Sequence, residues 1–180
     1  MKFFIITKKH IMLGIAAVLA VTGITVGSVR AFANNDRKLP IYCVETDKKQ
    51  VAISFDAAWG NDDTQTLIDI LKEYDVPATF FVVGSWVDKY PESVKALSDA
   101  GHQIQNHSNT HPHMPQLSRE QMRDEIESCN KKIADVTGVT PTLLRPPYGD
   151  YDNALIEVMD SLKMHTIQWD VETLATKVIV

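Results

Sequence analysis

The sequence predicts an α/β fold with a parallel β-sheet. Five short segments rich in β-branched and aromatic residues alternate with segments of helical periodicity. Four of the five end in, or are followed by, an ionisable residue, as happens when the carboxyl ends of parallel strands meet at one rim. The pattern fits an open doubly wound sheet or a barrel, although five units are fewer than a closed barrel commonly has.

The length and composition suit one globular domain with a hydrophobic core, since 44% of the 180 residues are hydrophobic and 23% are charged. Beyond residue 33, 14 Lys and Arg residues stand against 23 Asp and Glu residues, a formal net charge of −9. A domain with this charge would repel a phosphate backbone. Nucleic-acid binding is therefore excluded as a function.

Residues 1–33 are expected to be a signal peptide or an N-terminal membrane anchor. Residues 11–29 carry no charge, and a helix of this length, at ~1.5 Å per residue, spans about the ~30 Å of a bilayer's hydrocarbon. Lysines precede the segment and acidic residues begin only at Asp36, which predicts a single pass with the domain outside the cell membrane. Cleavage near Ala33, followed by secretion, is the alternative.

Residues 34–49 are polar and are expected to form a linker to a domain over residues 50–180. The chain has two cysteines, which are too few for a disulfide framework. Cys43 lies in the linker. Cys129 lies at helical spacing from apolar residues and is expected to be a small core residue.

The individual elements follow from periodicity and from residues that begin or end a segment. The strands are expected at residues 50–55, 78–83, 102–106, 142–145 and 165–169. The helices are expected over residues 62–75, 91–101, 118–137 and 153–163. An Asp caps the first helix, Pro91 and Gly101 bound the second, and a capping box at 118–121 with Gly138 bounds the third. One face of the first helix is lined by Leu67, Ile70, Leu71 and Tyr74.

The segment NHSNTHPHM, residues 106–114, contains three histidines. His107 and His111 are four residues apart, so a helical or tight turn directs both imidazoles at one cation. This spacing alone is weak, because such pairs also occur on solvated surfaces, but the turn-forming residues around it favour a metal site. His113 lies beyond Pro112 and is expected at the rim rather than among the ligands.

Three motifs in this order, ISFDAAWG, NHSNTHPHM and LLRPPYG, resemble the first three motifs of the polysaccharide deacetylase family, the NodB-homology or carbohydrate esterase family 4 domain. The resemblance covers residues 50 to about 174. It implies a distorted (β/α) barrel of the NodB-homology type that removes acetyl groups from N- or O-acetylated polysaccharides with a divalent metal, commonly zinc. FDAAWG and the membrane-anchored layout are most similar to bacterial peptidoglycan and sporulation-associated deacetylases.

The resemblance also implies roles for the motif residues. Asp56 is expected to be the general base, His107 and His111 the metal ligands, and Arg145 the partner that orients the base. These roles match the chemistry of amide hydrolysis, in which a bound metal activates water and polarises the carbonyl while a carboxylate takes the proton.

Three further residues are expected to contact the substrate: Trp59, Pro147 and Tyr148. Pro147 and Tyr148 would shape the acetyl pocket. The backbone N–H of Tyr148 would donate to the oxyanion, which also makes Tyr148 a catalytic residue.

The first motif departs from the family pattern. Ala57 stands where the family usually has a second aspartate, which supplies the third metal ligand. Asp62 or Asp63 would then reach round from the helix start, or water would fill the position, or the metal would bind weakly. The plainer interpretation of Asp62 and Asp63 is that they cap the helix.

The C-terminal residues depart further. Glu172, Ala175 and Thr176 stand where the family has an Asp-x-x-Asp-Trp-like motif, and the family's late acid histidine and closing strands are missing. We therefore expect a barrel incomplete at the C-terminus, with the fifth strand's outer edge unpaired and poor solubility. Deacetylation is expected to be far below that of a full-length relative, because the general acid is absent.

The expected function is a metal-dependent hydrolase acting on acetylated cell-wall glycan, with peptidoglycan as the substrate and GlcNAc or MurNAc as the sugar. The alternative is a catalytically inactive truncated remnant that at most binds glycan or metal. A metallo-phosphoesterase is disfavoured, because such sites hold several carboxylates around two metals.

Overall fold

The computed structural model of the chain describes residues 37–172. The expected membrane segment at residues 11–29 and the cleavage site near Ala33 lie outside the described residues. Within residues 37–172, no helix is both long enough and apolar enough to cross a membrane. The chain divides into two compact units, Met1–Arg37 and Lys38–Val180, and the described strands and helices lie in the second.

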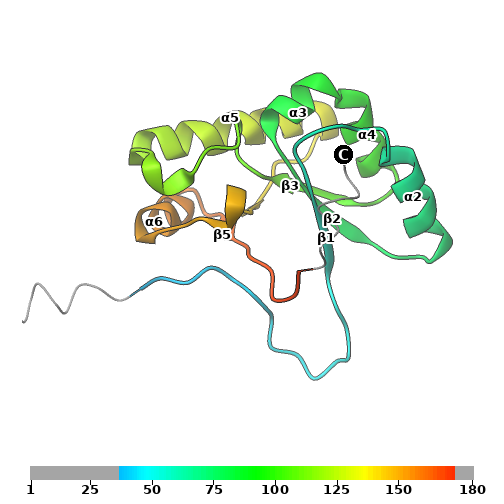
Figure 1. The fold of residues 1–180 in the computed structure, drawn as a ribbon, viewed down its shortest axis with the longest axis horizontal. Helices are drawn as coiled ribbons and strands as arrows, with labels where there is room; N and C mark the ends of the chain where they lie inside the picture. The colour runs from blue at the N-terminus through cyan, green and yellow to red at the C-terminus, as the bar shows by residue number, and fades with distance from the viewer. Residues whose placement is uncertain (1–36, 173–180) are drawn as a thin grey trace, which may run out of the picture. The chain divides into compact units, whose positions relative to one another are not determined.

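The centre of this unit is a five-stranded parallel sheet (Figure 1). The strands are β1 Ile53–Ala57, β2 Ala78–Val82, β3 Gln103–Asn106, β4 Leu143–Leu144 and β5 His165–Thr166. They lie in the order β1-β2-β3-β4-β5. A doubly wound sheet reverses its strand order near the middle, whereas this sheet adds each new strand on the same side, as a barrel does. The sheet does not close within the described residues.

Helices connect the strands, and Figure 1 shows α2, α3, α4 and α5 along one side of β1, β2 and β3. The helices are α2 Thr64–Glu73, α3 Gly84–Lys89, α4 Pro91–Asp99, α5 Arg119–Thr137 and α6 Asn153–Ser161, with 3-10 turns η1 Met114–Gln116 and η2 Pro147–Gly149. The sequence did not predict α3. It has six residues, too few to show a helical period, yet it buries Trp86 and Val87.

The ends of α5 and the start of α4 confirm the predicted boundaries. The Ser118 Oγ accepts a hydrogen bond from the Gln121 N–H, and the Gln121 side chain accepts one from the Ser118 N–H. Gly138 ends α5 with a φ of 76°, a left-handed conformation that favours glycine. Pro91 occupies the first turn of α4.

The buried face of α2 differs from the predicted one. Ile68 and Leu71 are buried, whereas Ile70 is 48% exposed and Tyr74 is 69% exposed. The helix ends at Glu73, and Tyr74 is its C-cap residue, with its ring in solvent. Leu67 and Leu71 belong to both the predicted face and the observed one. The two faces differ because Ile68, and not Ile70, packs into the core cluster.

Two clusters of buried side chains form the core. One lies around β1, β2 and β3 and includes Phe80, Val82 and Cys129. The other lies around β4 and includes Leu144, Met122 and Met164. The prediction that Cys129 is a core residue is confirmed, because it is fully buried and burial raises the pKa of its thiol to about 12.

The N-terminal end of the unit pairs with the last strand. Residues 38–52 form a loop that turns back on itself before it enters β1 (Figure 1). The Ile41 N–H donates to the Thr166 carbonyl at 2.9 Å, and the Gln168 N–H donates to the Ile41 carbonyl at 2.8 Å. The expectation that the outer edge of β5 is unpaired was therefore wrong, because a stretch expected to be only a linker covers part of that edge.

Candidate active site

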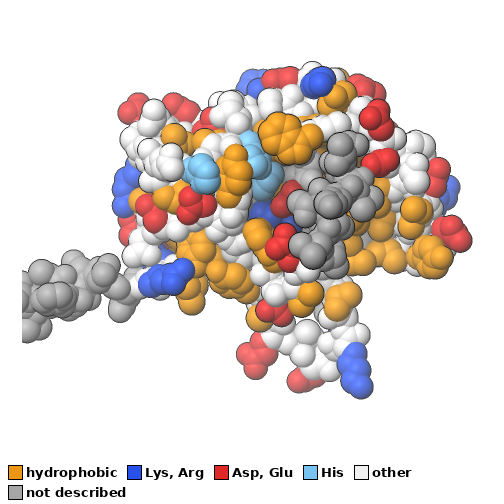
Figure 2. All heavy atoms as spheres, viewed as in Figure 1, with side chains coloured by type: hydrophobic (Ala, Val, Ile, Leu, Met, Phe, Trp, Pro, Cys, Tyr) orange, Lys and Arg blue, Asp and Glu red, His pale blue; other side chains and the backbone are white. Residues whose placement is uncertain are grey.

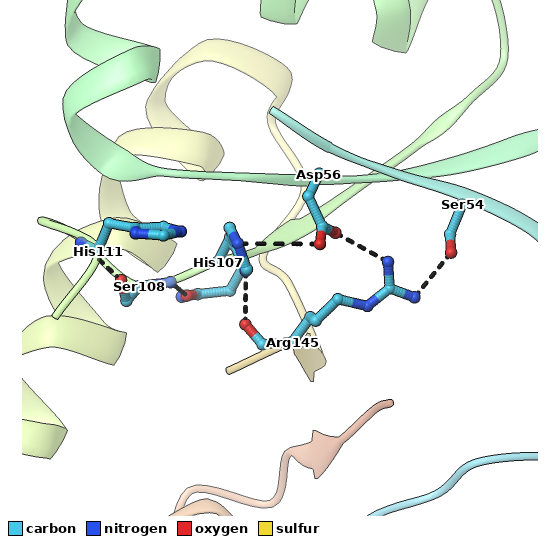
Figure 3. A network of polar contacts seen from close by, with 7 residues as sticks. Ser54, Asp56, His107, Ser108, His111 and Arg145 are labelled. Atoms are coloured by element: carbon cyan, nitrogen blue, oxygen red, sulfur yellow. Dashed lines mark hydrogen bonds and ion pairs between the residues drawn. The ribbon is translucent and has the colours of Figure 1, made fainter. Parts of the chain in front are cut away.

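A buried arginine joins β4 to β1 at the carboxyl ends of the strands (Figure 3). The Arg145 Nη1 donates to Asp56 Oδ1 at 2.8 Å, and its Nη2 donates to Ser54 Oγ at 2.7 Å. Ser54 and Asp56 are two residues apart on β1, so their side chains point to the same face of the sheet. Asp56 lies inside β1 rather than after it, because the strand begins at Ile53 and continues to Ala57.

Aromatic rings enclose the same guanidinium group. The Arg145 Cζ lies 4.2 Å from the centre of the Phe81 ring and 5.7 Å from that of Trp169. Arg145 is 5% exposed, and a buried charge of this kind needs a partner of opposite sign, which Asp56 provides. Hydrogen bonds and rings together leave the guanidinium little freedom, so one oxygen of Asp56 is held in place.

His107 follows β3 and points at the second oxygen of Asp56. Its Nδ1 lies 2.7 Å from the Arg145 carbonyl oxygen, which can only accept, so Nδ1 carries the proton. The Nε2 lone pair is then free and lies 3.9 Å from Asp56 Oδ2. Burial is the main reason that the pKa of His107 is lowered, which keeps the ring neutral as a metal ligand requires.

A tight turn brings His111 back beside His107. Their ring centres are 5.0 Å apart. Ser108 and His111 have φ values of 67° and 62°, a strained region for residues other than glycine that costs about 1 kcal/mol or more each. The His111 N–H donates to Ser108 Oγ at 2.9 Å, which closes the turn. Burial, followed by the nearby His107, lowers the pKa of His111 as well.

Two neutral imidazoles facing one space fit a divalent cation, and the buried His111 Nδ1 has no hydrogen-bond partner among the described residues. The described residues supply no third ligand for such a cation. Ala57 is buried in the apolar cluster with Phe80, and within residues 37–172 no three His, Cys, Asp or Glu side chains gather closely enough to hold a metal. The site thus offers two protein ligands to a cation.

Asp62 and Asp63 do not join the two histidines in the described part of the chain. Both side chains are exposed in the turn before α2, and neither belongs to a metal-binding group within the described part of the chain. Asp63 occupies the N-cap position of α2, as expected, but its side chain makes no capping hydrogen bond.

Exposed aromatic rings flank the histidines. Trp59 is 69% exposed and Tyr148 is 61% exposed, and their ring centres lie 6.0 Å and 4.7 Å from that of His111. Figure 2 shows exposed hydrophobic side chains next to the histidines on this face. Pro147 is buried beside Tyr148, whose φ of 61° is again left-handed.

His113 lies at the rim, apart from the pair of His107 and His111. Its ring stacks on Tyr148 with the centres 4.1 Å apart and the planes 14° apart. Its Nδ1 lies 3.1 Å from Asp150 Oδ2. His113 therefore packs against the Tyr148 ring, which also contacts the His111 ring.

Sequence reasoning missed Ser54, Gln168 and Trp169. Strand alternation was the available signal for Ser54, which is two residues before Asp56. Trp169 contacts both Arg145 and the turn at Gly149, where an added β-carbon would lie 2.8 Å from the Trp169 ring. The Gln168 Nε2 donates to the Gly149 carbonyl at 2.7 Å. Gln168 and Trp169 reach the segment from Arg145 to Gly149 only in the folded sheet, so no local sequence signal indicates this contact.

The model of the polysaccharide deacetylase family matches residues 44–167. The chain belongs to the polysaccharide deacetylase family. One relative in this family, the peptidoglycan-N-acetylmuramic acid deacetylase PdaA of Bacillus subtilis, is 35% identical over 131 residues, which are 72% of this chain and 50% of PdaA. The peptidoglycan-N-acetylglucosamine deacetylase PgdA of Listeria monocytogenes is 35% identical over 136 residues, which are 76% of this chain and 28% of PgdA.

Solved structures of polysaccharide deacetylases share the fold. The structure of PdaA, a family 4 carbohydrate esterase, superposes with a TM-score of 0.72 at 33% identity, over 77% of this chain and 60% of PdaA. A CE4 family pseudoenzyme from Bacillus anthracis gives a TM-score of 0.74 at 36% identity, over 77% of this chain and 50% of the pseudoenzyme. The predicted NodB-type α/β fold is confirmed, and the chain spans at most half the length of the two curated relatives named above.

Proposed function

We propose that this domain hydrolyses acetyl groups from N-acetylated sugars of cell-wall polysaccharide, with peptidoglycan as the substrate, on the outer side of the cell membrane. One observation carries the proposal. Arg145 binds one oxygen of Asp56 and leaves the other facing the Nε2 of His107. A carboxylate held in this way beside two neutral imidazoles is the arrangement that metal-assisted amide hydrolysis needs.

Asp56 acts on the proton of the attacking water. Its Oδ1 is held by the Arg145 Nη1, so Oδ2 is the oxygen that accepts the proton. In place of the late histidine that serves as the acid in the family, the protonated Asp56 carboxyl would return this proton to the departing nitrogen, which yields acetate and a free amine. A positioned acid or base of this kind contributes roughly 10²–10⁴-fold to the rate.

His107 and His111 would hold the divalent cation, for which zinc is the first candidate. When bound there, the cation polarises the amide carbonyl and lowers the pKa of water. The Arg145 carbonyl accepts from the His107 Nδ1 and thereby directs Nε2 at the cation position. Arg145 thus orients the base through its side chain and a ligand through its backbone.

The substrate would lie across the exposed rings on this face. Trp59 and Tyr148 flank His111, and large rings with a polar edge are suited to line a ligand site. The left-handed conformation of Tyr148 sets the direction of its backbone N–H, which we assign to the oxyanion of the tetrahedral intermediate.

The test measures free amine and acetate released from N-acetylchitohexaose and from acetylated peptidoglycan, with zinc supplied. The matched pair is Asp56→Asn and Asp69→Asn, since Asp69 is an exposed residue of α2 whose side chain accepts a hydrogen bond from Gln65. We expect the first variant to lose at least about 100-fold in rate and the second to match the wild type. Equal rates for Asp56→Asn and wild type would refute the assignment of the base.

A second candidate is a catalytically inactive domain that binds acetylated glycan without hydrolysing it. Ala57 favours this candidate, because it is an apolar residue at the position where the family has a carboxylate, and a similar structure is a CE4 family pseudoenzyme. Glycan binding without amine release in the wild type, with release appearing in Ala57→Asp, would select the second candidate. Release by the wild type selects the first.

A further inference from the structure

The turn between the two candidate metal ligands is bound by a carboxylate from a distant helix. Glu125, on α5, accepts from the Asn109 N–H and from the Thr110 N–H through the same oxygen, Oε2, at 2.8 Å each. Its Oε1 accepts from Thr110 Oγ1 at 2.7 Å. Asn109 and Thr110 lie between His107 and His111, so all three hydrogen bonds act on the segment that sets the spacing of the two rings.

The backbone conformation of this segment suits it to bind an anion. Ser108 and His111, on either side of the bound amides, have positive φ values. Consecutive amides in such a turn point the same way and form a concave site for negative charge. A carboxylate has lone pairs for all three donors, whereas a carboxamide has one oxygen and presents N–H groups at the other position.

The carbonyl side of the same turn is held by α3. The Gly84 N–H donates to the Ser108 carbonyl and the Ser85 N–H donates to the Asn109 carbonyl, at 2.9 Å each. A β-carbon at Gly84 would clash with the Asn109 side chain, so the approach is close. The turn is therefore clamped from two sides, with its carbonyls on α3 and its amides on Glu125.

We infer that Glu125 is a positioning residue for the His107 and His111 pair. It acts through Thr110, the residue directly before His111, and fixes the left-handed turn that places the His111 ring beside His107. Its effect on cation affinity rests on the proposed function, but its effect on the turn does not. Residues that support metal ligands in this way typically change metal affinity by about 10- to 100-fold when removed.

The experiment uses the full chain and four variants: Glu125→Ala, Glu125→Gln, Thr110→Val and Glu127→Gln. Glu127 is the matched control, because it lies on the same helix and pairs with Arg123 at the exposed surface. Two quantities are measured: the dissociation constant for Zn²⁺ and Co²⁺, and, without metal, amide exchange at Asn109 and Thr110 with the NMR signals of the His107 and His111 rings.

We expect Glu125→Ala to weaken cation binding by about 10- to 100-fold, to speed exchange of both amides and to shift the His111 ring signals. Glu125→Gln should fall between Ala and wild type, and Thr110→Val should weaken binding less than Glu125→Ala. Glu127→Gln should change none of these quantities. A loss of thermal stability in Glu125→Ala with unchanged ring signals and metal affinity would show a structural role only and overturn the inference.

The two hypotheses fail differently. A wild-type chain that binds neither cation contradicts the proposed metal site, and the amide exchange and ring signals of the metal-free protein then decide the role of Glu125. Unchanged exchange and ring signals in Glu125→Ala overturn the inference whether or not the wild type binds metal.

Discussion

The two halves of the candidate site differ in how completely they are built. In the base half, Asp56 is bound by Arg145, and Arg145 is bound in turn by Ser54 and two aromatic rings. In the cation half, His107 and His111 are neutral and oriented, but Ala57 supplies no carboxylate. Both halves depend on β1, because Asp56 and Ala57 are its last two residues and each half takes one of these positions.

The comparison shows which interactions hold each half together. Ion pairing and hydrogen bonds to a buried charge stabilise the base half without any ligand. The cation half consists of strained backbone and uncharged rings, and its geometry is held by surrounding hydrogen bonds. We expect the base half to govern the stability of the metal-free protein and the cation half to govern its response to metal.

The largest expected effect comes from unpairing Arg145. Asp56→Ala leaves a buried guanidinium without its carboxylate, and removal of one partner of a buried pair typically costs about 3–5 kcal/mol. Arg145→Met leaves Asp56, whose side chain is 37% exposed and can be hydrated, so its cost should be smaller. Urea unfolding of both variants measures the difference. Equal losses of unfolding free energy, or a larger loss for Arg145→Met, would show that Asp56 is not what stabilises the buried charge of Arg145.

A second change completes the cation half. Ala57→Asp places a carboxylate where an alanine packs in the apolar cluster, so without metal we expect a loss of about 1–3 kcal/mol. With zinc at 100 times its dissociation constant, binding should restore about 2.7 kcal/mol. Thermal unfolding of Ala57→Asp and of Ala57→Asn, with and without zinc, measures this. At one zinc concentration, a larger rise for the Asp variant than for the Asn variant identifies residue 57 as a ligand position, and equal rises would show that it is not.

The sequence predicted those parts of the fold and site that local signals specify. The capping box at Ser118 and the glycine at 138 set the limits of α5, and the strand-end positions of His107 and Arg145 placed the rim. The missed features depend on contacts between distant residues. Arg145 reaches Ser54 across 91 positions of the chain, and Ile41 pairs with β5 only because the sheet brings them together.

A smaller effect is expected from pH. Burial lowers the pKa of both His102 and His107, so the folded protein disfavours their charged forms. In the unfolded chain both histidines take up a proton near pH 6.5. Their contribution to the free energy of unfolding is therefore complete above about pH 6.5, and it is lost as the pH falls through the lower pKa values of the folded protein. We expect the free energy of unfolding to fall as the pH is lowered from 7.5 to 5.5. Urea titrations of the wild type and of His107→Gln measure it, and an unchanged slope in the variant would exclude His107 as a source.

The smallest expected effect tests the edge of β5. Ile41→Pro removes the N–H that donates to the Thr166 carbonyl, and a single backbone hydrogen bond contributes about 1 kcal/mol. Val44→Pro is the control, because Val44 is 77% exposed and lies outside the bridge. Urea unfolding should show a loss for Ile41→Pro that the control lacks, and hydrogen exchange should speed up at the amide of Gln168, which donates back to Ile41.

Because β5 precedes the residues that hold Gly149 and Arg145, loosening this edge should also weaken the cover that Trp169 gives to the base half. A variant that matches the control in both measurements would show that the segment before β1 rests on β5 without stabilising it.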